Sequence, residues 1–187
     1  MKRTLALAIF AAAVLAEDAP DEKRLEKDHA PTPYTAAEIR SGCLEGRTST
    51  YLMEVPGRDA FRQTLRFAKC DAEGADLEMS RTKTDGTPMG EPVKARETWK
   101  EFQSHGSFPE KDTKISEETI TLPAGKFECV VYAVTVTQGE KTGIRRFHFA
   151  KKLPGPPVKV VVELDGKVVS TMTLVEHKDG TAPEPAK

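Results

Sequence analysis

The sequence lacks asparagine altogether and contains only three cysteines and one tryptophan. Without asparagine there is no N-x-S/T glycosylation site. The cysteines form no C-x-x-C pair, the usual motif of thiol–disulfide enzymes. The chain also has no G-x-S-x-G elbow, no H-E-x-x-H pair and no glycine-rich phosphate loop. We therefore predict no catalytic residue, no metal site and no cofactor.

No charge of one sign dominates the chain either. The 28 lysine and arginine residues are balanced by 29 aspartate and glutamate residues, which gives a formal net charge of −1. Such a balance lacks the basic surface of nucleic-acid-binding proteins, so we expect no nucleic-acid partner. Beyond residue 16 no apolar run approaches the roughly 20 residues of a membrane-spanning helix, so no membrane span is predicted.

The N-terminus has the layout of a secretory signal peptide. Lys2 and Arg3 precede an apolar run from residue 5 to residue 15, and Ala16 ends the segment. We predict a signal peptide over 1–16 and a periplasmic or secreted location. Residues 17–33 are charged and contain proline, and they have few large apolar groups, so we predict a disordered leader. A single β-rich domain over 34–178 and a flexible tail over 179–187 complete the predicted organisation.

Most of the domain alternates between apolar and polar residues, with turn residues about every ten positions. Two capping boxes, at 35–38 and 98–101, predict short helices. Because short connections join successive strands, the strands should be antiparallel neighbours. The predicted fold is mainly β, an antiparallel meander curved into an incomplete or half barrel with one or two short helices. The predicted strands are 47–55, 60–70, 76–84, 92–97, 114–122, 127–137, 143–151, 158–164 and 167–175.

The predicted strand at 127–136 is apolar on both faces, so both faces should be covered. One face carries Val130, Tyr132, Val134 and Val136. The strands at 158–164 and 167–175 have one clean apolar face and one mixed face. A curved sheet with a core on one side and an apolar concavity on the other fits this pattern, and so does a closed barrel or sandwich.

Two further residues complete the predicted ligand-binding set. Trp99 lies within the second capping box and should close one end of the core. His148 alternates with Ile144 and Arg146 on one strand face, where it either lines a pocket or is half-exposed. The predicted ligand-binding residues are Val130, Tyr132, Val134, Val136, Trp99 and His148.

The three cysteines allow at most one disulfide within the chain. Cys129 lies inside the most apolar strand and should be a small buried hydrophobe. This leaves Cys43 and Cys70 as the predicted disulfide in an oxidising compartment. Three unpaired thiols are the alternative.

The C-terminal half, about residues 114–176, carries a recognisable series of segments. A polar strand leads into Pro123-Ala124-Gly125-Lys126-Phe127; then come 147–151, 153–159 and a hairpin turn at 165–166. This series resembles exported bacterial proteins of unknown function that are similar to the incomplete β-barrel of LolA/LolB-like lipoprotein carriers. The resemblance implies that fold and, by analogy, a carrier role. Its motifs are turns and core positions.

These patterns favour a non-enzymatic function. We predict an exported soluble domain that binds an apolar small molecule, a lipid or an exported protein in a sheet concavity. One alternative is a structural or interaction module of the cell envelope that docks through a sheet edge. Another is a hydrolase or metal enzyme that uses His148 or His105. The sequence carries no signal for an oligomeric state.

Overall fold

The computed structural model describes residues 22–181. The predicted signal peptide, the first part of the predicted leader and residues 182–187 lie outside this range. Nine strands, two α-helices and one 3-10 turn make up the described chain, and each strand overlaps one of the nine predicted. The strands are β1 Thr48–Glu54, β2 Phe61–Cys70, β3 Gly74–Lys83, β4 Val93–Thr98, β5 Thr113–Leu122, β6 Gly125–Gln138, β7 Lys141–Ala150, β8 Lys159–Leu164 and β9 Lys167–Lys178.

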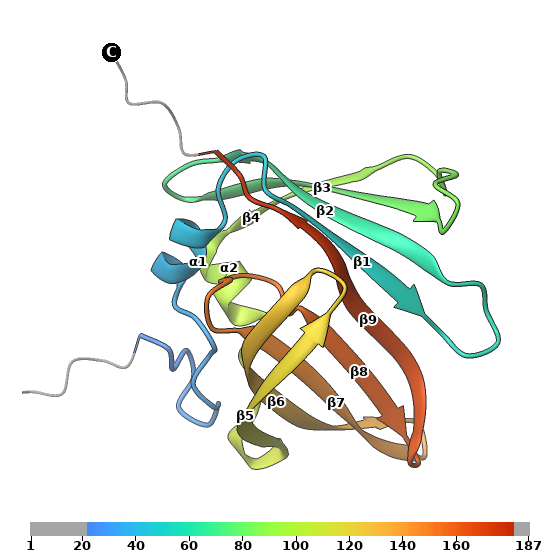
Figure 1. Cartoon of the computed structure of the whole chain (residues 1–187). Helices are drawn as coiled ribbons and strands as arrows, with labels where there is room; N and C mark the ends of the chain where they lie inside the picture. The colour runs from blue at the N-terminus through green and yellow to red at the C-terminus, as the bar shows by residue number, and fades with distance from the viewer. Residues whose placement is uncertain (1–21, 182–187) are drawn as a thin grey trace, which may run out of the picture.

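All nine strands form one antiparallel sheet in the order β4-β3-β2-β1-β9-β8-β7-β6-β5. The order contains two meanders, β1–β4 and β5–β9, and the first and last strands join them at the centre of the sheet. The second meander is so strongly curved that β5 approaches β9 without joining it (Figure 1). The sheet stays open, with β4 and β5 as its edges, which confirms the predicted mainly β, incomplete-barrel fold.

Both helices begin at the predicted capping boxes. In α1, Ala36–Gly42, and α2, Trp99–Ser104, a threonine side chain accepts from the third helical N–H while a glutamate accepts from the threonine N–H. These reciprocal hydrogen bonds satisfy N–H groups that a helix leaves free at its start. The two helices contact each other and lie together at one side of the curved sheet (Figure 1).

Two hydrophobic clusters lie on opposite sides of β6. Tyr132 and Val134 belong to the cluster beneath the helices, whereas Cys129 and Val131 belong to the second cluster. Successive side chains in a strand point to opposite faces, which explains the division. Tyr132 is 2% exposed and Val131 4%, so both faces of this strand are covered, as its apolar pattern predicts.

The N-terminal segment differs from the predicted disordered leader. Residues 22–33 pack along the domain, with Ala30 and Thr32 buried. The Ala30 N–H donates to the Phe108 carbonyl at 2.9 Å, and Tyr132 Oη donates to the Pro31 carbonyl at 2.6 Å. The segment is thus held largely by hydrogen bonds, which its composition does not reveal, because composition reports only the capacity for apolar burial.

The start of the predicted flexible tail is also paired. The Thr181 N–H donates to the Glu45 carbonyl at 2.9 Å, in an isolated antiparallel bridge. The strand β9 itself ends at Lys178, the predicted domain boundary. The expectation of flexibility for the rest of the tail falls on residues outside the described range.

Candidate functional site

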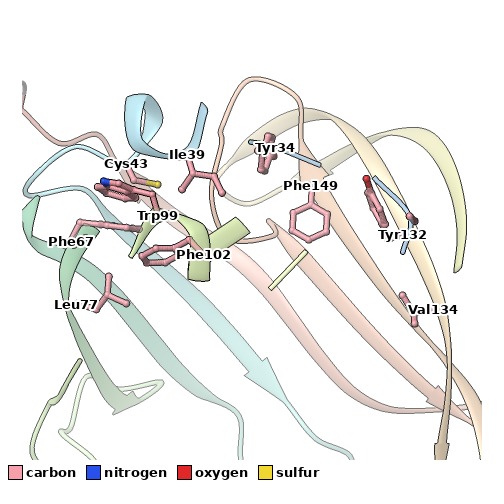
Figure 2. Packing of buried hydrophobic residues seen from close by; sticks show 12 residues of the cluster. Tyr34, Ile39, Cys43, Phe67, Leu77, Trp99, Phe102, Tyr132, Val134 and Phe149 are labelled. Atoms are coloured by element: carbon pink, nitrogen blue, oxygen red, sulfur yellow. The ribbon is translucent and has the colours of Figure 1, made fainter. Parts of the chain in front are cut away.

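A cavity of about 310 Å³ lies between the sheet and the helices. Residues from β1–β4, β7 and β9 line it together with both helices and the loop that follows β7. Figure 2 shows Tyr34, Ile39, Leu77, Phe102 and Phe149 converging on this part of the molecule. The full lining is Pro33, Tyr34, Ile39, Tyr51, Gln63, Leu65, Leu77, Met79, Glu97, Phe102, Gln103, His105, Gly106, Phe147, Phe149, Gly155, Pro156, Pro157 and Met172.

Strand alternation builds one wall of the cavity. Leu77 and Met79 of β3 are two residues apart, so both side chains face the same side of the sheet. Leu65 of β2 lies directly opposite Met79, and Gln63 lies opposite Tyr51 of β1. The pairing of β1 with β9 then brings Met172 close to Tyr51 on the same wall.

The facing wall comes from the second meander and the loop after it. Phe147 and Phe149 of β7 are stacked, with ring centroids 6.1 Å apart. The loop containing Gly155, Pro156 and Pro157 connects β7 to β8. Gly155 has φ of +123°, and a Cβ there would lie 2.9 Å from Cys43 Sγ, so a side chain would disturb this wall.

Besides Gln63 of β2 and the two tyrosines, three polar side chains interrupt the apolar lining, all of them near α2. Gln103 is fully engaged: its Oε1 accepts from the Ala36 N–H, and its Nε2 donates to the Glu22 carbonyl and to Thr32 Oγ1. The other two are Glu97 and His105.

Glu97 and His105 form a loose pair beside the cavity. Glu97 Oε2 lies 3.8 Å from His105 Nε2, too far for a hydrogen bond. That oxygen is buried and has no hydrogen-bond partner in the described part of the chain. It is therefore the one orphaned acceptor among the cavity's described lining residues.

None of the six predicted ligand-binding residues lines this cavity. Tyr132 and Val134 are buried in the cluster beneath the helices, where Tyr132 packs against Phe108 and Phe149. Val130 and Val136 are half-buried. Two residues that do line the cavity are their cross-strand neighbours: Phe147 pairs with Tyr132, and Phe149 pairs with Val130. The six predicted ligand-binding residues stay a prediction, and two of them, Val130 and Tyr132, lie one strand away from the cavity lining.

Trp99 and His148 also lie outside the cavity lining. Trp99 is buried in the cluster beneath the helices, stacks on Phe102 and donates from Nε1 to the Asp71 carbonyl at 3.0 Å. His148 is 5% exposed, and its Nε2 lies 3.4 Å from a Glu118 carboxylate oxygen. Burial lowers the pKa of His148, and the Glu118 charge opposes this shift.

The cysteines lie largely as their sequence context suggests. Cys129 is buried in the second cluster. Cys70 Sγ donates to the Cys43 carbonyl at 3.3 Å, so the two predicted disulfide partners are neighbours, although their sulfurs are unbonded in the structure. Burial raises the pKa of both thiols to about 11, and Arg47 beside Cys43 opposes that rise. The disulfide stays a prediction.

One group of possible metal ligands occurs in the described chain. Ligand atoms of Glu26, Asp28 and His29 lie within 4.8 Å of one another. Both acids are exposed, and His29 Nδ1 is hydrogen-bonded to Ser107 Oγ at 2.7 Å. Exposed carboxylates often gather without binding an ion, so we assign no metal to this group. Within residues 22–181 no helix is long and apolar enough to cross a membrane.

Comparisons with known proteins show the fold and no family. No protein-family model and no curated protein matches the sequence. The structure is similar to MucB in complex with MucA(peri), with a TM-score of 0.51 and 14% identity over 80% of this chain and 55% of the MucB chain. It is also similar to a "putative lipoprotein" from Parabacteroides distasonis (TM-score 0.49, 15% identity, 73% of this chain and 96% of that one). The MucB likeness shows that the curved open sheet occurs in a solved structure.

Proposed function

We propose that this protein is an exported, non-enzymatic binding domain that takes an apolar ligand into the cavity between sheet and helices. The ligand class is a lipid, an apolar small molecule or an apolar segment of an exported protein. The observation that carries the proposal is the cavity itself, with a volume of about 310 Å³ and a lining of aromatic, aliphatic and methionine side chains.

The lining has the character of a binding site for apolar groups. Small-molecule sites are commonly concave, mainly apolar and about 300–1,000 Å³ in volume, with a few polar groups that orient the ligand. Here Leu65, Met79 and Phe147 are half-buried, so their apolar surface stays partly available. Covering it would gain roughly 25 cal/mol per Å² of apolar surface removed from water.

Two further observations support export and binding. The sequence predicts a signal peptide, which places the domain in the periplasm or outside the cell. MucB, which shares the fold, was crystallised with a partner, MucA(peri). The absence of catalytic motifs from the sequence fits a binding role as well.

The test fills the cavity with a larger side chain. Met79→Trp should project an indole into the lining, whereas Met89→Trp introduces the same group at a position that is 47% exposed in a loop. Uptake of N-phenyl-1-naphthylamine, a fluorophore that brightens in apolar surroundings, is measured for the wild type and both variants. We expect uptake by the wild type and Met89→Trp and at least about a tenfold weaker Kd for Met79→Trp. Wild-type protein that takes up no fluorophore would contradict the proposal.

An edge-docking module is the second candidate. The edge strand β5 is ten residues long and exposed over most of its length, and Ile115 in it is 47% exposed. Such an edge can accept an extended peptide as an extra strand. If this edge is the docking site, an envelope protein should co-purify with the wild type and with Met79→Trp. The variant Ile115→Lys should abolish that co-purification. The reverse pattern would favour the cavity.

A further inference from the structure

We propose that the cavity selects amphiphiles whose polar head is a cationic hydrogen-bond donor, such as a primary ammonium group, over those with an anionic head. This inference rests on the proposed function and names the ligand class of the same site. It is carried by the charges and the orphaned acceptor among the lining residues.

Glu97 lies on the side of the sheet that faces the helices. Glu97 lies in β4 opposite Ala75 of β3, and directly paired residues share a face of the sheet. Ala75 is fully buried in the cluster beneath the helices. The Glu97 side chain is therefore on the concave side, where it contributes to the cavity lining beside Leu77 and Phe102.

The Glu97 carboxylate has one oxygen without a hydrogen-bond donor in the described part of the chain. Glu97 Oε2 is buried and accepts no hydrogen bond within residues 22–181, and His105 Nε2 is 3.8 Å away. A buried acceptor without a donor is costly, and a charged acceptor more so. A ligand that brings an N–H group to this oxygen would remove that cost and form a charge-assisted hydrogen bond.

The cavity lining offers no lysine or arginine that could pair with an anionic head group. Of the residues described as lining the cavity, none is a lysine or an arginine, and Glu97 is the one carboxylate. Arg47 is close to the loop wall but is not a lining residue: its Nη1 donates to the Gly42 and Pro154 carbonyls and contacts Cys43 Sγ. A carboxylate or phosphate head in the cavity would therefore meet the Glu97 carboxylate, with no lysine or arginine in the lining to compensate its charge.

The experiment compares three amphiphiles that share a ten-carbon tail and differ in their polar head group. Decylamine, decanol and decanoate, each below its critical micelle concentration, compete with N-phenyl-1-naphthylamine for the full-length protein at neutral pH. The proteins are the wild type, Glu97→Gln and Glu91→Gln. Glu91 is an exposed loop residue, so this matched control makes the same change in net charge away from the site.

We expect decylamine to displace the fluorophore at a concentration about tenfold or more below that of decanoate, with decanol between them. Glu97→Gln should reduce this ratio to less than about threefold, and Glu91→Gln should leave it unchanged. Equal displacement by all three heads of the wild type, or a preference that survives in Glu97→Gln, would overturn the inference while leaving an apolar binding cavity. No fluorophore uptake by the wild type would instead reject the proposed function. The wild-type ranking is a test even if a variant folds poorly.

If head selectivity is absent, Glu97 has a simpler role. An inward-pointing charge on an edge strand discourages pairing with another sheet. Glu97→Gln should then raise self-association in analytical ultracentrifugation without changing the order of the three competitors, which is the outcome that assigns the residue to edge protection.

Discussion

Replacing Gln103 with methionine should loosen the attachment of the whole N-terminal segment. Gln103 is 4% exposed and joins three parts of the chain: the Glu22 carbonyl at 2.7 Å, Thr32 Oγ1 at 3.0 Å and the Ala36 N–H at 3.0 Å. Methionine fills a similar volume but makes none of these bonds. Three polar groups therefore each lose one hydrogen bond at once, although Thr32 Oγ1 keeps its contacts with the Lys23 and Tyr34 carbonyls.

The expected loss follows from the number of bonds. A typical internal hydrogen bond contributes about 0.5–1.5 kcal/mol net, and a buried group left without a partner costs more. Three such bonds give a loss of roughly 2–4 kcal/mol in the free energy of unfolding. Gln63→Met is the matched control, because Gln63 accepts one exposed bond from Arg81 at 3.3 Å. Its effect should stay within about 0.5 kcal/mol.

Urea unfolding of both variants, followed by circular dichroism and by the fluorescence of the single tryptophan, Trp99, measures the loss. Hydrogen exchange localises it: amides of residues 22–34 should exchange faster in Gln103→Met, and those of β6 should change little. A loss of less than about 0.5 kcal/mol in the free energy of unfolding, with unchanged hydrogen exchange over 22–34, would refute the reasoning. It would show that the hydrogen bonds of Gln103 do not hold this segment in place.

Two further predictions concern the cysteines and a buried histidine. Oxidised glutathione should close the Cys43–Cys70 disulfide, lowering the count of free thiols from three to one by thiol titration; the link, 27 residues apart in sequence, should add about 3–4 kcal/mol of stability. An unchanged thiol count after prolonged oxidation at pH 8.5 would contradict it. Burial lowers the pKa of His148 in the folded state, so its contribution to stability is present above the unfolded value near 6.5 and is lost as pH falls through the folded pKa. His148→Gln should therefore flatten the decline in unfolding free energy between pH 7 and pH 5, and an identical decline in both proteins would show that His148 does not contribute.

Local signals in the sequence predicted most of the elements. The capping boxes that begin at Thr35 and Thr98 each involve four consecutive residues, so they can be recognised without knowledge of the fold. The same holds for the turn after Leu164, where Asp165 and Gly166 both have positive φ. Alternation likewise predicted that both faces of β6 are covered.

The cavity depends on long-range pairing, which no local pattern encodes. Its two walls meet because β1 bonds to β9, which places Tyr51 of the first meander beside Leu174 of the second. Without that pairing the sequence cannot show that Leu65 and Phe147 line the same space. The hydrogen-bonded segment before Tyr34 escaped prediction for a related reason, since Gln103, one of its main partners, lies about 70 residues away.

The bond between the opening and closing strands also has a consequence for the order of assembly. Each meander can fold from contacts between neighbours, but their junction must wait until β9 has been synthesised. Contacts between distant parts of a chain form late because the intervening loop must close first. A nascent or truncated molecule that ends before β9 therefore lacks the junction that brings the two cavity walls together, and the cavity belongs to the finished molecule.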